Sequence, residues 1–412
     1  MPNNRWEPKA RAVKDVKTVT IGGTYLTDDT ISITINQKSM VVTLLAGLSN
    51  PGIATIIQQA WERLPFSAAQ ASVVPAGGKE DIAEFGELTA TVSGAIVTLT
   101  ADKGGVPQTV SVSKVSASGT VTLASPTVAT GPNFYDDTEN WSLATLPAAG
   151  EDIFVDNTAV SIQYGMDASA VALASFTQAQ NFLGDIGLPE LNANGYLEHR
   201  PTYLQIDAAT ILLGNGPGTG SRRIKIDSGS TTANAVTVEN TGAPAKQGLP
   251  AVFWKGTNAG NTLEVHRGQV GIAVLGGETA TLTSALLAGG NVEFGKGVGT
   301  IATLTNQIAT VMLRSTVTAF TSAGGLVTIL GDAAFTTMDI TGGAVDYRSS
   351  GTIGALTVGG PGGTLDCAND NSTRIISAAT IEGGGRINDP LQTIDFTTGV
   401  QPGPTARALT AE

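Results

Sequence analysis

Pairs of adjacent glycines that are followed by a strand-like patch recur at short intervals in the C-terminal half of the chain. Five such pairs begin at Gly289, Gly324, Gly342, Gly362 and Gly384. The step from 324 to 342 is 18 residues and that from 342 to 362 is 20, while the 35 residues after 289 leave room for one unmarked row at 308–313. A unit this short has too few apolar groups to close a core alone, so neighbouring units must stack.

Each patch alternates apolar and polar residues. In the row after Gly342, for example, Val345 and Tyr347 alternate with Asp346. A period of two places one set inward and the other outward, and glycine suits corners where φ is positive. The pattern predicts an all-β dominated chain whose main body is a parallel β-helix, or β-solenoid. An antiparallel sandwich also has short strands at regular spacing; the β-solenoid is favoured because the glycine pair recurs in register with the same strand.

The charge and cysteine content of the chain narrow the possible partners. Lys and Arg number 23 and Asp and Glu 35, a formal net charge of −12, so a nucleic-acid partner, which needs a basic surface, is not expected. The single cysteine, Cys367, excludes an internal disulfide framework and is expected to be a small buried apolar group. No apolar run approaches the ~20 residues that span a bilayer, and residues 1–17 carry no secretion signal, so neither a membrane partner nor export is expected.

The N-terminal part of the chain divides into a basic segment and a small module. Residues 1–17 predict either a solvated tail or a docking arm that binds an acidic protein surface through Arg5, with Trp6 as its anchor. Residues 18–125 predict a small α+β domain in which one helix packs on a β-sheet. Asn50 is expected to cap that helix, and Ser93-Gly94 indicates a hairpin.

The module resembles a small unit that recurs across virion proteins of tailed bacteriophages. The resemblance rests on Thr89-Ala90-Thr91-Val92-Ser93-Gly94, on Val97-Thr98-Leu99-Thr100-Ala101 and on Lys103-Gly104-Gly105, which follow a helix and the strand Ile33-Thr34-Ile35-Asn36. It covers residues 18–125 and consists of strand and turn residues without chemistry. It implies a virion surface protein assembled in the host cytoplasm, a homotrimer, with the major capsid protein or the tail as partners.

The rest of the chain is expected to form a linker, the β-helix and a tail. Residues 126–139 are a linker by composition, residues 140–396 the parallel β-helix, and residues 397–412 a loose C-terminal tail or one that crosses to a neighbouring chain. The segment around Asn140-Trp141-Ser142 resembles the entry segment of many surface β-helices. Trp141 is the expected plug of the open core, because an aromatic ring suits the end cap that a β-helix needs.

The strand pattern is interrupted between Gly184 and Arg200, where residues that are rare elsewhere in the chain gather. They are Tyr196, Glu198, His199, Arg200 and, just beyond, Tyr203. Glycines and prolines mark the segment as an inserted loop. It is the best candidate for a partner-binding patch, and a loop folded on the wall of the β-solenoid is the alternative.

Two carboxylates occupy matching places in successive rows. Asp346 and Asp366, with Glu293 in the corresponding place of an earlier row, would stack about 4.8 Å apart on the outer face. A separation of about 5 Å suits a retaining glycosidase, so these two are fallback catalytic residues. A surface acid column is the more ordinary outcome. Neither His199 nor His266 has a partner at metal-ligand spacing, and no metal or cofactor is expected.

The sequence therefore predicts a non-catalytic structural virion protein, either capsid-decorating or tail-attached, whose β-helix forms a surface projection. One alternative is a tailspike-like glycan depolymerase that uses Asp346 and Asp366. Another is a receptor-binding adhesin that uses the loop at 196–203 on a host surface glycan.

Overall fold

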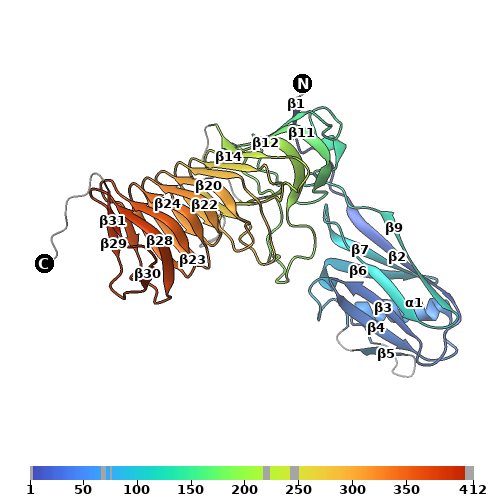
Figure 1. Ribbon diagram of the computed structural model, residues 1–412. Coiled ribbons are helices and arrows are strands. Elements are labelled where there is room, and N and C mark those ends of the chain that lie inside the picture. Colours follow the sequence, from blue (N-terminus) through green and yellow to red (C-terminus); the bar gives the residue numbers. More distant parts are fainter. Residues whose placement is uncertain (1–2, 66–70, 75–76, 217–222, 242–249, 404–412) are drawn as a thin grey trace.

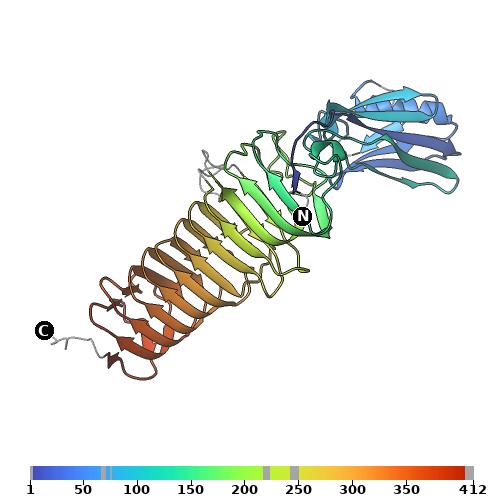
Figure 2. The ribbon, with the colours of Figure 1, turned by 90° about the horizontal axis from the view of Figure 1, so that it is seen from above.

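The structure is a computed structural model and describes residues 3–65, 71–74, 77–216, 223–241 and 250–403. Two bodies make up the molecule: a long β-helix and a smaller module near its N-terminal end (Figure 1). Seen from above, the β-helix is a ladder of stacked strands and the module projects from one end of it (Figure 2). The predicted fold class, an all-β dominated chain with a parallel β-helix, is confirmed.

The β-helix consists of two ladders in which the pairs between described strands are parallel. The first ladder contains β1 (Asn3–Arg5), β10 (Asp152–Val155), β11 (Asp167–Ala179), β12 (Leu204–Asn215), β14 (Ala235–Val238), β16 (Thr262–Val265), β18 (Ser284–Leu287), β20 (Ile301–Asn306), β22 (Val317–Ser322), β24 (Phe335–Ile340), β26 (Ile353–Val358), β28 (Arg374–Ile381), β30 (Ile394–Phe396) and β31 (Gln401–Pro402). The second ladder branches from the start of β12 and contains β13 (Ile224–Asp227), β15 (Val252–Lys255), β17 (Gln269–Ile272), β19 (Asn291–Phe294), β21 (Thr310–Leu313), β23 (Leu326–Gly331), β25 (Ala344–Ser349), β27 (Thr364–Asp366) and β29 (Arg386–Asn388). This pairing excludes the antiparallel sandwich.

The glycine pairs stand at the corners that precede strands of the second ladder. Gly290, Gly325 and Gly343 have φ values of +86°, +74° and +72° and lead into β19, β23 and β25. The unmarked row expected at 308–313 contains β21. The strand after each corner pairs in register with the strand of the next row. The rows inferred from the glycines are therefore the rungs of the β-helix.

Inward side chains of successive rungs stack into apolar columns. One column of the second ladder consists of Ile224, Val252, Val270, Val292, Val311, Val327, Val345, Leu365 and Ile387. Cys367 belongs to the same core and is fully buried, as its alternating position predicts. Each aliphatic side chain buried in this way contributes about 1.5–3 kcal/mol, so stacking supplies the stability that a single rung lacks.

The module has its own hydrophobic core and two antiparallel sheets. The first sheet contains β6 (Leu88–Ser93), β7 (Ile96–Gly104), β2 (Lys14–Gly23) and β9 (Gly119–Thr127), in that order. The second contains β5 (Ala71–Val74), β4 (Lys38–Leu44), β3 (Thr30–Ile35) and β8 (Ser111–Val115). The expected hairpin at Ser93-Gly94 joins β6 and β7. The module therefore has two sheets and not the single sheet that its sequence pattern predicts.

One helix, α1 (Asn50–Trp61), packs mainly on the first sheet of the module. Ile53, Ile56, Ile57 and Trp61 are buried on one face, as the helical spacing predicts. The cap differs from the prediction: Ser49, not Asn50, is the N-cap, and its hydroxyl accepts a hydrogen bond from the amide of Gly52 at 3.2 Å. Asn50 is already helical, so its side chain cannot serve as the cap.

The N-terminal residues belong to both bodies. Strand β1 pairs with β10 of the β-helix, with Asn3 opposite Asp152, whereas Lys14–Gly23 form β2 of the module. The chain thus begins in the β-helix, enters the module and returns. Val13 and Thr130 form an antiparallel bridge where the outgoing and returning chains pass each other. Strands at both ends extend past the expected boundaries at 17, 125 and 396; of the expected tail, residues 404–412 lie outside the described residues.

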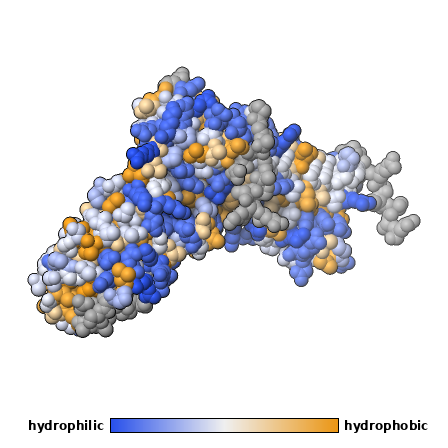
Figure 3. Space-filling view, turned by 180° about the vertical axis from the view of Figure 1, so that it is seen from behind, coloured by the Kyte–Doolittle hydropathy of each residue, from blue (hydrophilic) through white to orange (hydrophobic). Residues whose placement is uncertain are grey.

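On the face turned away in Figure 1, small hydrophobic groups are scattered among hydrophilic ones (Figure 3). No helix in the described ranges is both long and apolar enough to cross a membrane.

Candidate functional site

The residues expected in a docking arm lie at the N-terminal end of the β-helix core. Trp6 is only 1% exposed and packs edge-to-face on Trp141 at 5.3 Å between ring centroids. Trp141 donates from its indole nitrogen to the carbonyl of Tyr135 at 2.8 Å. Arg5 forms an ion pair with Asp156 and lies 5.7 Å from the ring of Phe154. In this conformation Trp6 is buried in the core of its own chain.

Asn140 fixes the same end of the core through its side chain. The side-chain oxygen of Asn140 accepts hydrogen bonds from the amides of Lys9 and Ala10, both at 2.9 Å. Its amide nitrogen donates to the carbonyls of Gly131 and Phe134 at 2.8 and 2.9 Å. One buried side chain therefore ties the outgoing chain to the returning chain. A buried amide with its groups satisfied in this way specifies a single arrangement.

The inserted loop at 184–203, here called the strut loop, reaches from the β-helix to the module. It connects β11 and β12, and its tip turns at Gly195, where φ is +88°. Tyr196 and Arg200 are 4% and 6% exposed although they belong to a loop. Contacts with the module bury them, so the strut loop braces one body against the other.

Glu87 of the module is the centre of that contact. One of its carboxylate oxygens accepts hydrogen bonds from the Tyr196 hydroxyl and the Asn194 amide, both at 2.6 Å. The other oxygen forms an ion pair with Arg200 at 2.6 Å and accepts from Gln108 at 3.1 Å. Four polar groups thus surround one carboxylate, three of them from the strut loop.

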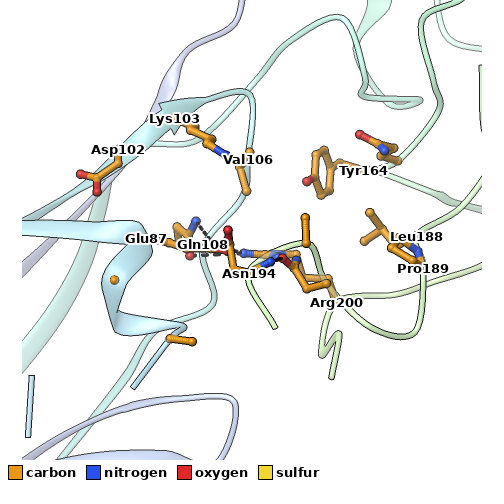
Figure 4. A pocket seen from close by; sticks show the side chains of 15 residues that line it. Glu87, Asp102, Lys103, Val106, Gln108, Tyr164, Leu188, Pro189, Asn194 and Arg200 are labelled. Atoms are coloured by element: carbon orange, nitrogen blue, oxygen red, sulfur yellow. Dashed lines mark hydrogen bonds and ion pairs between the residues drawn. The ribbon is translucent and has the colours of Figure 1, made fainter. Parts of the chain in front are cut away.

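Arg200 completes the network with two more partners. Its guanidinium forms an ion pair with Glu198 at 3.2 Å and donates to the carbonyl of Pro107 in the module at 2.9 Å. Figure 4 shows Glu87, Gln108, Asn194 and Arg200 converging from the two bodies. The planar guanidinium suits this role, because its five donors have fixed directions.

The network holds its groups in their charged forms. Burial opposes ionisation of Glu87, but the hydrogen bond from Tyr196 and the charge of Arg200 outweigh it, so the pKa of Glu87 is lowered. Burial also opposes the charge of Arg200, yet Glu198 and Glu87 raise its pKa. Burial and the bond to Glu87 raise the pKa of Tyr196, which stays a neutral donor. Glu87, which is partly buried, and Arg200, which is buried, therefore form a charged pair over the neutral pH range.

The side chains of His199 and Tyr203 lie in different surroundings from each other. Both ring nitrogens of His199 are buried and have no hydrogen-bond partner in the part of the chain that the structure describes. Burial, then the charge of Arg200, lower the pKa of His199, so the imidazole is neutral. Tyr203 packs on the β-helix, where the amines of Lys255 and Lys225 lie 4.6 and 5.2 Å from its ring. The structure thus brings Tyr196, Glu198, His199 and Arg200 together and places Tyr203 apart from them.

A cleft of about 520 Å³ lies between the module and the β-helix, beside the Glu87–Arg200 pair. This joint cleft is lined by Ala83, Gly86, Glu87, Asp102, Lys103, Val106, Gln108, Gln163, Tyr164, Leu188, Pro189, Asn192, Ala193, Asn194 and Arg200. Val106, Tyr164 and Leu188 stand around its open space (Figure 4). Because its residues come from three distant segments, no local sequence signal could have located it.

The expected carboxylates lie in one column of the second ladder, but Met312 and Thr328 separate Glu293 from Asp346. Asp346 and Asp366 are register partners, and the same column contains Glu293, Met312 and Thr328. Arg348 binds Asp346 at 2.6 Å, and the Asn388 amide donates to Asp366 at 2.9 Å. Arg348 was missed, although two residues apart on one strand is the spacing that places side chains on the same face.

Among the described residues, no group of three or more His, Cys, Asp or Glu side chains is arranged to hold a metal ion. His266 lies between Glu239 and Glu264 at 2.9 and 2.8 Å, on the surface of the β-helix. Compared with models of known protein families and with curated proteins, the chain matches none of them.

Proposed function

We propose that the protein is a structural, non-catalytic component of the virion of a tailed bacteriophage, attached to the capsid or to the tail, and that its β-helix is a surface projection. The observation that carries the proposal is the braced joint. The ion pair of Arg200 with Glu87, and the bridge between the outgoing and returning chains at Val13 and Thr130, hold the module at one end of a continuous column of rungs. A scaffold that must point in a fixed direction from its attachment needs such a brace. The assignment to a virion rests on the resemblance of residues 18–125 to a unit found in phage virion proteins.

The surroundings of Asp346 and Asp366 favour a scaffold over a glycan depolymerase. Arg348 and the Asn369 amide engage Asp346, and Asn388 engages Asp366. Their column continues with Thr328 and Met312, so it offers no aromatic platform for a sugar ring. The partners of both carboxylates come from the chain itself.

Self-association as a homotrimer is part of the proposal. The outer face of the first ladder supports it, because one outward column there has only small, uncharged side chains. This column consists of Ala235, Thr262, Ser284, Thr303, Ala319, Thr337, Ala355 and Ala378. Such a face lets β-helices approach closely. Light scattering on the purified protein is expected to give three times the chain mass, and the mass of a single chain would remove the trimer from the proposal.

The location is tested on purified particles. Gold-labelled antibodies against the module are expected to mark the particle surface, and gel densitometry then separates the sites, since a decoration protein is present in hundreds of copies and a tail protein in a handful. Particles without the protein would refute the virion assignment. Shortening of host capsule or lipopolysaccharide chains by the wild type, lost in Asp366→Asn, would replace the scaffold with the enzyme.

A further inference from the structure

We infer that the joint cleft is a binding site for a neutral saccharide of one or two rings. Ligand sites occur preferentially where domains meet and measure about 300–1,000 Å³. The joint cleft lies between the module and the β-helix and measures about 520 Å³. The inference goes beyond the scaffold role and does not depend on it, because a site of this kind could serve the protein at any location.

The polar groups of the cleft fall into two sets with different tasks. Glu87, Gln108, Asn194 and Arg200 are hydrogen-bonded to one another, Asp102 to Thr89 and Asn192 to Glu198, so their positions are fixed before a ligand arrives. The amine of Lys103, the amide of Gln163 and the hydroxyl of Tyr164 form no hydrogen bond or ion pair within the described part of the chain. The first set is the frame, and the second set is free to bind.

The charges of the lining select a neutral ligand. Two carboxylates, Glu87 and Asp102, and two cations, Lys103 and Arg200, belong to the lining, so it has no net formal charge. Glu87 and Arg200 neutralise each other directly at 2.6 Å. An anionic ligand would meet the two carboxylates and a cationic one the two cations, and either would add an uncompensated charge to a partly desolvated cleft.

The chemistry of the free groups suits a sugar. Each of them, an amine, an amide and a phenol, can exchange hydrogen bonds with a hydroxyl group. The ring of Tyr164 and the apolar side chains of Val106, Leu188 and Pro189 offer a surface for the C–H face of a pyranose. Figure 4 shows Tyr164 and Leu188 on the β-helix side of the cleft and Val106 on the module side. A sugar ring presents this combination of a hydroxyl edge and an apolar face.

Saturation-transfer NMR on the purified full-length protein tests the inference. The probes are neutral mono- and disaccharides built from glucose, galactose, mannose, rhamnose and N-acetylglucosamine, together with glucuronic acid and sialic acid as charged counterparts. Transfer to at least one neutral sugar at millimolar concentration is expected. The absence of transfer to every neutral sugar, or a preference for the acids, would overturn the inference.

Variants place the binding in the cleft. Gln163→Ala and Lys103→Ala each remove one free group from a partly or fully exposed side chain, and each is expected to weaken binding about 3- to 10-fold, the value of one hydrogen bond. Tyr164→Phe keeps the ring and is expected to bind more tightly than Tyr164→Ala. Gln307→Ala, an exposed glutamine outside the cleft lining, is the matched control. Binding that all cleft variants retain at the wild-type level would refute the site.

Competition separates the two sources of such a sugar. A neutral cell-surface polysaccharide that displaces the bound monosaccharide identifies a glycan chain end as the source, and a polysaccharide that does not displace it identifies a free sugar. The test reads binding by the isolated protein, whereas the proposed scaffold role is read on particles, so failure of one leaves the other standing.

Discussion

Replacing Gly343 with alanine is expected to destabilise the β-helix by about 2–5 kcal/mol, the sum of backbone strain and overpacking. Gly343 has φ of +72°, a conformation that costs an L-residue about 1–2 kcal/mol. A Cβ atom there would also lie 2.6 Å from the carbonyl oxygen of Gly325 in the preceding rung. That oxygen accepts the amide of Ala344 at 3.0 Å, so it cannot move away without lengthening a ladder hydrogen bond.

Two other glycines separate the strain from the contact. Gly362 has φ of +91°, but a Cβ added there would meet nothing within 4 Å, so Gly362→Ala is expected to cost only the strain of about 1–2 kcal/mol. At Gly276 there is neither a left-handed φ nor an atom within 4 Å of an added Cβ. Gly276→Ala is therefore expected to change stability by less than about 1 kcal/mol.

Urea unfolding followed by far-UV circular dichroism measures the three variants. Tryptophan fluorescence is unsuitable, because all four tryptophans lie at or before Trp254. Hydrogen exchange then locates the loss, which is expected in peptides covering β23 and β25, since a rung contacts only its neighbours. If Gly343→Ala and Gly362→Ala lower the free energy of unfolding by the same amount, the close approach of neighbouring corners contributes nothing to the loss. If neither costs stability, the account of the corners is refuted.

Three further substitutions test the joint, a buried amine and the end of the core. Arg200→Met leaves Glu87 and Glu198 without their cation, a loss of about 3–5 kcal/mol; X-ray scattering is expected to show a wider spread of module positions with unchanged circular dichroism, and an unchanged curve would contradict it. Burial lowers the pKa of Lys225 below 10.5, and its amine has no hydrogen-bond partner within the described residues. The folded state therefore binds fewer protons than the unfolded state, so wild-type stability should rise with pH toward 10.5, and Lys225→Met should add about 1 kcal/mol or more at pH 7. The urea midpoints of the two proteins should show that the stability gained by Lys225→Met decreases as the pH rises. A gain that is the same at every pH would contradict the lowered pKa of Lys225. Trp141→Ala is expected to cost about 3–5 kcal/mol and to raise hydrogen exchange first in β1 and β10, so exchange raised only in distant rungs would contradict its role.

The rungs could be predicted because their signal is local and repeats. Gly342 and Gly362 mark equivalent corners, and counting from them places Asp346 opposite Asp366, as the register shows. The environment of those carboxylates was less predictable, since Arg348 was overlooked and Asn388 lies in the next rung. Periodicity predicts which residues stack, but it does not predict which side chains form ion pairs or hydrogen bonds with a carboxylate.

The joint could not be predicted, because its contacts join segments far apart in the sequence. Arg200 and Glu87 look like ordinary surface charges in the sequence, and only the folded chain makes them neighbours. Strand β1 is three residues long and has no alternation long enough to be recognised. The composition of the strut loop predicted a partner-binding patch, but it did not indicate that the module would lie against these residues. Whether a separate partner also binds them stays a prediction, while the structure places them against the module.

The pairing of Asn3 with Asp152 has a consequence for folding during synthesis, because the first strand of the ladder must wait for its partner. At a synthesis rate of about 5–20 residues per second, the opening strand leaves the ribosome roughly 7–30 s before its neighbour does. The module is complete within that interval, so it can fold before the first rung closes. Once folded, the module holds Val13 beside Thr130, so β1 is already close to the segment with which it will pair when that segment is made.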